Sequence, residues 1–176
     1  MAPQIRNRRG ISNVVATIIL IAVAIALAVA VAVWVFSLAG SSAKTATLNV
    51  ESMGLTIGSS SSSTSTLTLV LNNPSSSSIG INGFTLGGLT CTFQTAISIQ
   101  PGTQGAQLTI NLPAGNGGTV SSTSYSSISV TTSGTGIGAP APVSVCTGSI
   151  TLTTGTQYPG ELTTTSGQTY MFNAPS

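Results

Sequence analysis

The side chains that could do chemistry are few in this chain of 176 residues, which has no histidine. Its carboxylates are Glu51 and Glu161, which lie in separate segments. General acid–base catalysis depends on positioned histidines or carboxylates, and a zinc site needs a cluster of cysteine, histidine or acidic ligands. The sequence has neither pattern. We therefore expect two ordinary solvated glutamates, no bound metal or cofactor, and a protein that is not an enzyme.

The basic residues are Arg6, Arg8, Arg9 and Lys44, all near the N-terminus. Proteins that bind nucleic acid neutralise phosphates with clustered lysine and arginine side chains. The sequence after Lys44 contains neither residue type. Binding to nucleic acid is therefore not expected.

The two cysteines, Cys91 and Cys146, both lie in strand-like sequence. In an extracellular domain they would form a disulfide that closes a loop of about 55 residues and stabilises the fold by roughly 4 kcal/mol in the chain-entropy model. The alternative is a pair of buried free thiols. We favour the disulfide.

The elements that would have to position these residues change character along the chain. A basic segment, Arg6–Gly10, runs directly into an apolar stretch from Ile11 to Ala39 that contains no glycine or proline. A helix over Val14–Ala39 would be about 39 Å long and would cross the ~30 Å hydrocarbon layer of a bilayer. The sequence therefore predicts one continuous apolar helix.

Several classes of N-terminal segment share this pattern. A cleaved secretory signal has a shorter apolar core, and a buried helix of a soluble protein is seldom apolar on every face. A plain signal anchor fits the length, with the arginines held inside by the positive-inside rule. The anchor stays open as an interpretation.

The sequence from Arg8 to Leu20, RRGISNVVATIIL, resembles the processing site and stalk of archaeal type IV pilins. The resemblance covers the leader, of the class III signal-peptide type, and the stalk. It implies that a prepilin peptidase cuts between Gly10 and Ile11 and leaves the helix on the mature protein. The implied processing site consists of Arg8, Arg9, Gly10 and Ile11.

One position favours the archaeal branch of this family. Bacterial type IV pilins usually carry a glutamate near the start of the mature helix, and the corresponding residue here is Val15. Archaeal members commonly lack that acid. Archaeal flagellins share the same leader and stalk, so the resemblance fits them as well.

Alanines recur every four residues in the apolar stretch and form two stripes on nearly opposite sides of a helix, because an offset of two residues is about 200°. Small residues at this spacing let apolar helices approach closely. The alternative is an ordinary membrane span rich in alanine and valine. The stripes are Ala22, Ala26 and Ala30 on one side, and Ala24, Ala28 and Ala32 on the other.

After Lys44 the pattern changes to short alternating segments rich in valine, isoleucine and threonine, which favour strands. Clusters of glycine, proline, asparagine and serine separate these segments. We therefore predict an α+β protein with a leader (residues 1–10), a stalk helix (11–43) and an antiparallel, immunoglobulin-like β-sandwich head (44–176). The expected strands are Thr47–Glu51, Leu67–Leu71, Ile79–Leu86, Thr90–Ile99, Gln107–Leu112, Ser127–Thr131, Val143–Thr153 and Thr169–Phe172.

Two runs of serine are hydroxyl-rich and turn-like, and they would accept O-linked sugars on an exposed surface. The alternative is a pair of flexible loops. The candidate acceptors are Ser59, Ser60, Ser61, Ser62, Ser63, Ser75, Ser76, Ser77 and Ser78.

Together, these patterns favour a structural subunit of an archaeal type IV pilus, which polymerises through its helix into an adhesion filament at the cell surface. The resemblance implies, besides other copies of the chain, a prepilin peptidase, an assembly ATPase and a membrane platform protein as partners. It also implies residence in the cytoplasmic membrane before assembly. A motility filament subunit and a monomeric membrane-anchored surface binding protein are the alternatives.

The shortage of titratable groups predicts that stability barely changes in acid. Stability depends on pH only where the folded and unfolded states bind different numbers of protons, and the chain has two carboxylates and no histidine. We expect nearly equal unfolding midpoints at pH 3 and pH 7 for the detergent-solubilised chain, followed by circular dichroism. A large loss of stability at pH 3 would contradict this expectation.

Overall fold

The computed structural model describes residues 9–42 and 47–176. The chain divides into two compact units, Met1–Thr45 and Ala46–Ser176, close to the expected boundary between residues 43 and 44. The first unit contains the helix α1 (Arg9–Ser42), and the second is built from strands. The predicted α+β fold class is confirmed.

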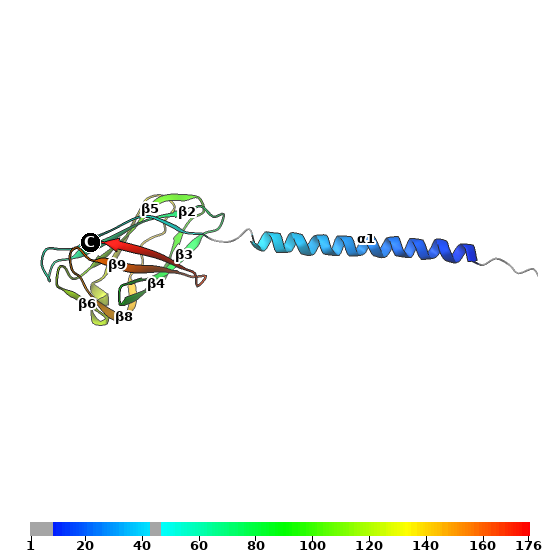
Figure 1. The fold of residues 1–176 in the computed structure, drawn as a ribbon. Coiled ribbons are helices and arrows are strands. Elements are labelled where there is room, and N and C mark those ends of the chain that lie inside the picture. Colours follow the sequence, from blue (N-terminus) through cyan, green and yellow to red (C-terminus); the bar gives the residue numbers. More distant parts are fainter. Residues whose placement is uncertain (1–8, 43–46) are drawn as a thin grey trace, which may run out of the picture. The chain divides into compact units, whose positions relative to one another are not determined.

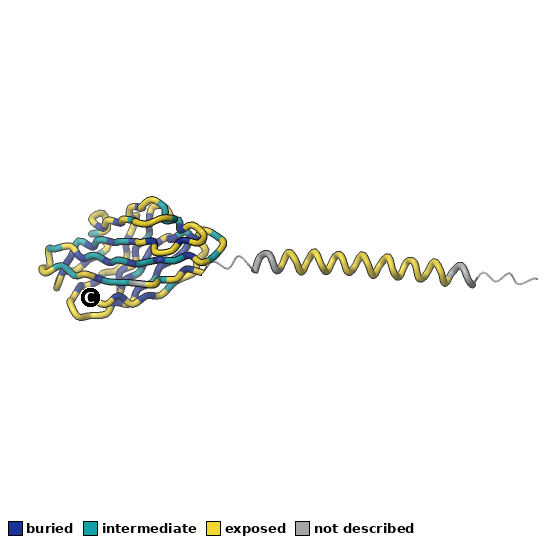
Figure 2. The backbone as a smooth tube through the Cα atoms, turned by 90° about the horizontal axis from the view of Figure 1, so that it is seen from above, coloured by how far each residue is buried: buried dark blue, intermediate teal, exposed yellow. Residues whose placement is uncertain are grey.

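The helix α1 is 34 residues long and continuous. Alanine and leucine favour the helix, the many valines and isoleucines are tolerated in it, and the first glycine after Gly10 is Gly40, in the last turn. Its described side chains are exposed all around, as Figure 2 shows. The stretch Asn13–Leu38 is long and apolar enough to cross a membrane, by length and composition.

The head consists of two antiparallel sheets packed face to face (Figure 1). One sheet has the strand order β1-β2-β5-β7, and the other has the order β10-β9-β3-β4-β8-β6. This architecture confirms the predicted sandwich. The elements are β1 (Asn49–Thr56), β2 (Ser65–Asn73), β3 (Ile79–Leu86), β4 (Leu89–Ile99), β5 (Thr103–Leu112), β6 (Thr119–Ser121), the 3₁₀ helix η1 (Ser122–Ser127), β7 (Ser129–Ser133), β8 (Val143–Thr151), β9 (Gln157–Thr164) and β10 (Thr169–Pro175).

The core lies between the two sheets and follows from side chains that alternate along each strand. In β2, Leu67, Leu69 and Leu71 are fully buried, while the residues between them are half-buried on the outer face. Aromatic side chains from the other sheet complete the core, and the rings of Phe84 and Phe93 lie 5.9 Å apart. The head therefore has a contiguous core of its own.

Two strands were not expected from the sequence. One is the three-residue β6, and the other is β9, which lies between β10 and β3. Proline has no backbone N–H to donate to a neighbouring strand. Pro159 and Gly160 in the sequence therefore indicate a turn rather than a strand. Pro159 is tolerated because the pairing with β3 ends at Gly160, and the Pro159 carbonyl accepts a hydrogen bond from Gly87 N, 2.8 Å away, in the turn that follows β3.

The ends of several expected strands also need correction. The first strand begins at Asn49 and continues to Thr56, and β7 begins at Ser129, since residues 122–127 form η1. The periodicity is weak in β1 because the strand has a bulge between Val50 and Ser52, and in β7 because serine and threonine make up most of the strand.

Gly148 in β8 is a position where the fold requires glycine, because there is no room for a side chain. Its φ is +79°, and a Cβ at this position would clash with the backbone carbonyl oxygen of Gly88. Gly155, in the turn before β9, has φ +78° but open space around the same position. An alanine would cause backbone strain at both positions but a steric clash only at Gly148, so the two substitutions can be compared to distinguish these effects.

We expect Gly148→Ala to lower the free energy of unfolding by about 3 kcal/mol, since overpacking adds to left-handed strain. Gly155→Ala should cost only about 1 kcal/mol from strain alone. Urea titration of the detergent-solubilised chain measures both. Equal losses in the two variants would contradict the assigned contact between β8 and the β3–β4 turn.

Candidate functional site

The expected processing site lies at the start of α1. Arg9, Gly10 and Ile11 are the first three residues of the helix, so the Gly10–Ile11 bond lies in its first turn. Arg8 lies outside the described residues. Gly10 is a weak point of this turn, because glycine costs about 1 kcal/mol relative to alanine in a helix.

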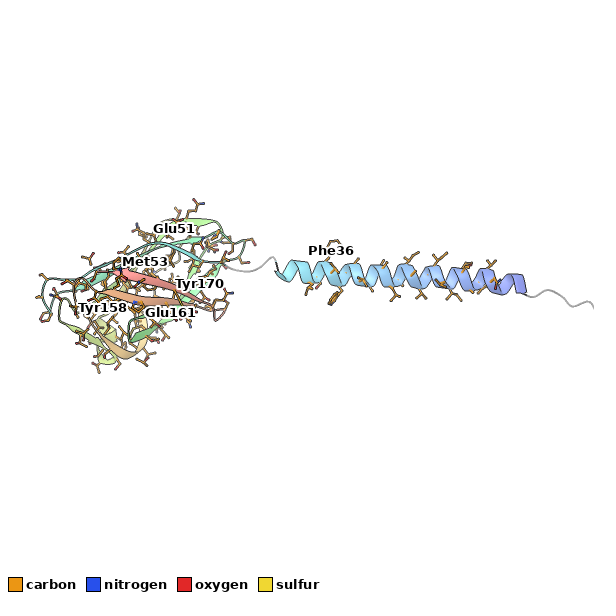
Figure 3. The ribbon with its side chains drawn as sticks, in the orientation of Figure 1. Phe36, Glu51, Met53, Tyr158, Glu161 and Tyr170 are labelled. Atoms are coloured by element: carbon orange, nitrogen blue, oxygen red, sulfur yellow. A yellow bond between two sulfur atoms is a disulfide. The ribbon has the colours of Figure 1, made fainter. Side chains whose placement is uncertain are left out.

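The apolar surface of α1 extends around its full circumference. Large side chains from Val14 to Leu38 are between about half and four-fifths exposed, and Phe36, labelled in Figure 3, is 78% exposed. No residue from Ile11 to Ala43 is charged. Such a surface is far larger than the apolar patches that soluble monomers expose, and it marks an interaction with a membrane or another protein.

The small residues of α1 lie on the exposed helix as expected, and one part of its surface is hollowed. A depression of about 570 Å³ occurs where Ala16 and Ala24 lie between larger neighbours, among them Ile19, Leu20 and Leu27. Small side chains in such a shallow depression let another apolar helix approach closely. Of the six stripe alanines, Ala24 lines this depression.

The two cysteines form the predicted disulfide. Cys91 in β4 lies directly opposite Cys146 in β8, with Cα atoms 4.1 Å apart. Both are buried, at 1% and 3% exposure. The bridge therefore joins neighbouring strands of the six-stranded sheet and encloses the excursion of the chain through β5 and β7 of the other sheet.

The two glutamates belong to different sheets. Glu51 is exposed on β1, at a bulge where the register with β2 shifts between Val50 and Ser52. Glu161 is half-buried on β9. The described residues contain no group of three or more histidine, cysteine or acidic side chains that could hold a metal.

Glu161 lines a groove of about 770 Å³ on the outer face of the six-stranded sheet, which we call the β9 groove. Its outward position follows from its neighbours Gly160 and Leu162, which are buried. Figure 3 labels Met53 and Glu161 beside β10 and β9. The walls of the groove include Met53, Thr85, Pro159, Met171 and Phe172.

Sequence reasoning missed the β9 groove, because it did not predict β9. The alternation of Tyr158, Gly160 and Leu162, all buried, is the signal that would have placed Glu161 on an outer face. A side chain expected to be simply solvated is instead half-buried between apolar neighbours.

The serine runs form ordered turns in this structure. In the β1–β2 turn, Ser63 N donates to Ser60 O at 3.0 Å and Ser60 N donates to Ser63 Oγ at 2.9 Å. In the β2–β3 turn, the fully buried Asn73 donates to the carbonyls of Ser77 and Ile99. The exposed candidate acceptors are Ser59, Ser60, Ser61, Ser62, Ser76 and Ser78, and the half-buried ones are Ser63, Ser75 and Ser77.

No protein-family model and no curated protein matches the chain. The structure itself defines a broad class of protein, in which an apolar helix of membrane-spanning length precedes a disulfide-bonded β-sandwich head.

Proposed function

We propose that this chain is a structural subunit of an archaeal type IV pilus, which polymerises through α1 into an extracellular adhesion filament. One observation carries the proposal: the part of α1 after Ile11 is uncharged and apolar on every face, and it continues directly from the Arg8–Ile11 junction. The protein is not an enzyme and needs no cofactor. Its activity is self-assembly into a filament.

Cleavage at Gly10–Ile11 suits the position of this bond. Before cleavage, the arginines hold the N-terminus on the cytoplasmic side of the membrane, where a prepilin peptidase reaches the junction. The weak first turn at Gly10 eases local unwinding for the peptidase. Cleavage removes Arg6, Arg8 and Arg9, so no charged side chain remains before Lys44.

The stalk provides two faces for close packing. Lipid tails are as apolar as leucine, so moving α1 from the membrane into a filament core gains little from the hydrophobic effect. The gain comes instead from van der Waals contacts, which alanine stripes on opposite sides of one helix allow with two neighbours. Because this gain is modest, an assembly ATPase and a membrane platform protein supply the work of extraction.

The head suits a position on the outside of such a filament. It has its own core, so it folds without help from the stalk contacts. Its buried disulfide is typical of oxidising surroundings. The exposed serines of its turns are sites for O-linked sugars at the cell surface.

A monomeric, membrane-anchored binding protein is the second candidate, and the β9 groove favours it, because α1 would then serve only as a tether. A motility filament subunit shares the assembly mechanism. Loss of swimming on deletion, with adhesion retained, would select that alternative.

The first test is the N-terminus of mature protein sheared from the cell surface, measured by mass spectrometry. We expect it to begin at Ile11. An uncut Gly10–Ile11 bond would select the membrane anchor. A start near Gly40–Lys44 would mean a secreted head without a stalk, and the filament proposal would be wrong.

A second test alters the packing of the stalk without altering its apolar character. Ala26→Leu widens the middle of one alanine stripe, and we expect filament yield to fall about tenfold, since overpacking a close helix contact costs about 1–3 kcal/mol. Ile25→Leu lies between the stripes and outside the depression and conserves volume, so it serves as the control. Quantitative immunoblots of sheared and membrane fractions measure the yield; equal membrane levels with unchanged filaments in Ala26→Leu would exclude the stripe as a contact.

A further inference from the structure

The carboxylate of Glu161 lies in apolar surroundings. In the sheet register Glu161 is opposite Met171 on one side and Thr85 on the other. Met171 is 77% exposed, an unusual degree for an apolar side chain on a folded head. The floor of the β9 groove is closed, because the ring of Phe172 covers Gly160, the residue before Glu161.

This carboxylate has no hydrogen-bonding or ionic partner among the described side chains of the head. Its neighbours Thr85 and Asn173 make their hydrogen bonds with other residues, and residues 47–176 contain no lysine, arginine or histidine. A half-buried charge next to thioethers is best satisfied by a cation that brings its own apolar stem. The groove therefore suits a lysine side chain.

The sequence contains one lysine, Lys44. Cleavage at Gly10–Ile11 would remove all three arginines, and the side-chain charges of the mature chain would be Lys44, Glu51 and Glu161. Lys44 lies outside the described residues, between α1 and β1. It would be the sole side-chain cation in a filament made of this chain.

We propose that the β9 groove binds Lys44 of a neighbouring copy of the chain, an inference that rests on the proposed filament. The ammonium group pairs with the Glu161 carboxylate, and the methylene stem packs along Met53 and Met171. Met53 is held by a hydrogen bond from Asn173 N to its sulfur, whereas the exposed Met171 is flexible and adapts to such a stem. The contact complements the stalk packing with one that fixes each head against the next subunit.

The geometry of this contact suits an open polymer. The groove and Lys44 are different parts of the chain, so each copy offers one of each. The interface is therefore of the head-to-tail kind, which builds a helical filament when the rotation between copies does not close a ring. Glu51 is less suited to hold Lys44, because it is exposed on β1 and does not line the β9 groove. Glu51 is therefore the matched control.

The test reverses the charges one at a time and together in the full chain. We expect Glu161→Lys and Lys44→Glu each to lower the yield of sheared filament about fivefold, the upper range for loss of one exposed ion pair. The double variant, Lys44→Glu with Glu161→Lys, should recover to within about twofold of the wild type, because the pair is restored with opposite sign. Glu51→Lys should assemble normally.

Folding is checked separately in each variant. Glu161 is on the outer face of β9, so a lysine there leaves the core intact, and formation of the Cys91–Cys146 disulfide in the membrane fraction verifies the head. Single reversals that assemble like the wild type, or a double variant no better than the singles, would overturn the proposal. A defect in Glu161→Lys alone would mean that the groove holds another occupant, which also overturns it.

A cross-link tests proximity directly. Lys44→Cys combined with Met171→Cys should give a ladder of covalent multimers in oxidised filaments, whereas Lys44→Cys with Ser129→Cys, on the exposed face of the other sheet, should not. Filaments without a ladder would refute the Lys44 contact and leave the filament proposal standing. Wild-type cells without any filament of this chain would refute the proposed function itself.

Discussion

The need to keep water away from α1 governs the organisation of the whole chain. A helix whose described side chains are exposed and almost all apolar on every side is not stable in water, because its apolar surface stays in contact with the solvent. A bilayer or a sheath of identical helices satisfies this need equally well. The absence of charge from Ile11 to Ala43 makes the same helix compatible with both surroundings.

The head meets a different constraint, since it must be stable in water almost without ions. No ion pair joins residues 47–176, which contain no cation, so polar groups are satisfied by hydroxyls, amides and the backbone. On the outer face of the four-stranded sheet, Thr66 donates to Asn111, which donates to Ser129, at 3.1 and 3.2 Å. Every buried side-chain nitrogen and oxygen of the described residues has a hydrogen-bond partner. Such a network works independently of salt, which screens charges but not neutral hydrogen bonds.

Much of this fold could be predicted because its strongest signals are local. The apolar run defines α1, and alternation such as Leu67-Thr68-Leu69 defines strands with one buried face. The disulfide was predicted from the expected extracellular location of the head and from two cysteines in strand-like sequence. What escaped prediction was nonlocal: β9 carries Pro159 and Gly160, and only its place between β10 and the end of β3 explains why proline is acceptable there. Because the β9 groove combines residues from β1, β3, β9 and β10, no single stretch of sequence could have revealed it.

The disulfide also sets a mechanical limit on the head. A pull between the ends of the chain reaches the head at two edge strands, β1 from the N-terminal side and β10 from the C-terminal side. Further in, tension meets Cys91 and passes directly to Cys146 through the sulfur–sulfur bond. The intervening chain, including β5, β6 and β7, carries no load and cannot be drawn out. A stretched head therefore has a fixed maximum extension, and its inner strands can serve as the template on which the peeled strands pair again when the tension is released.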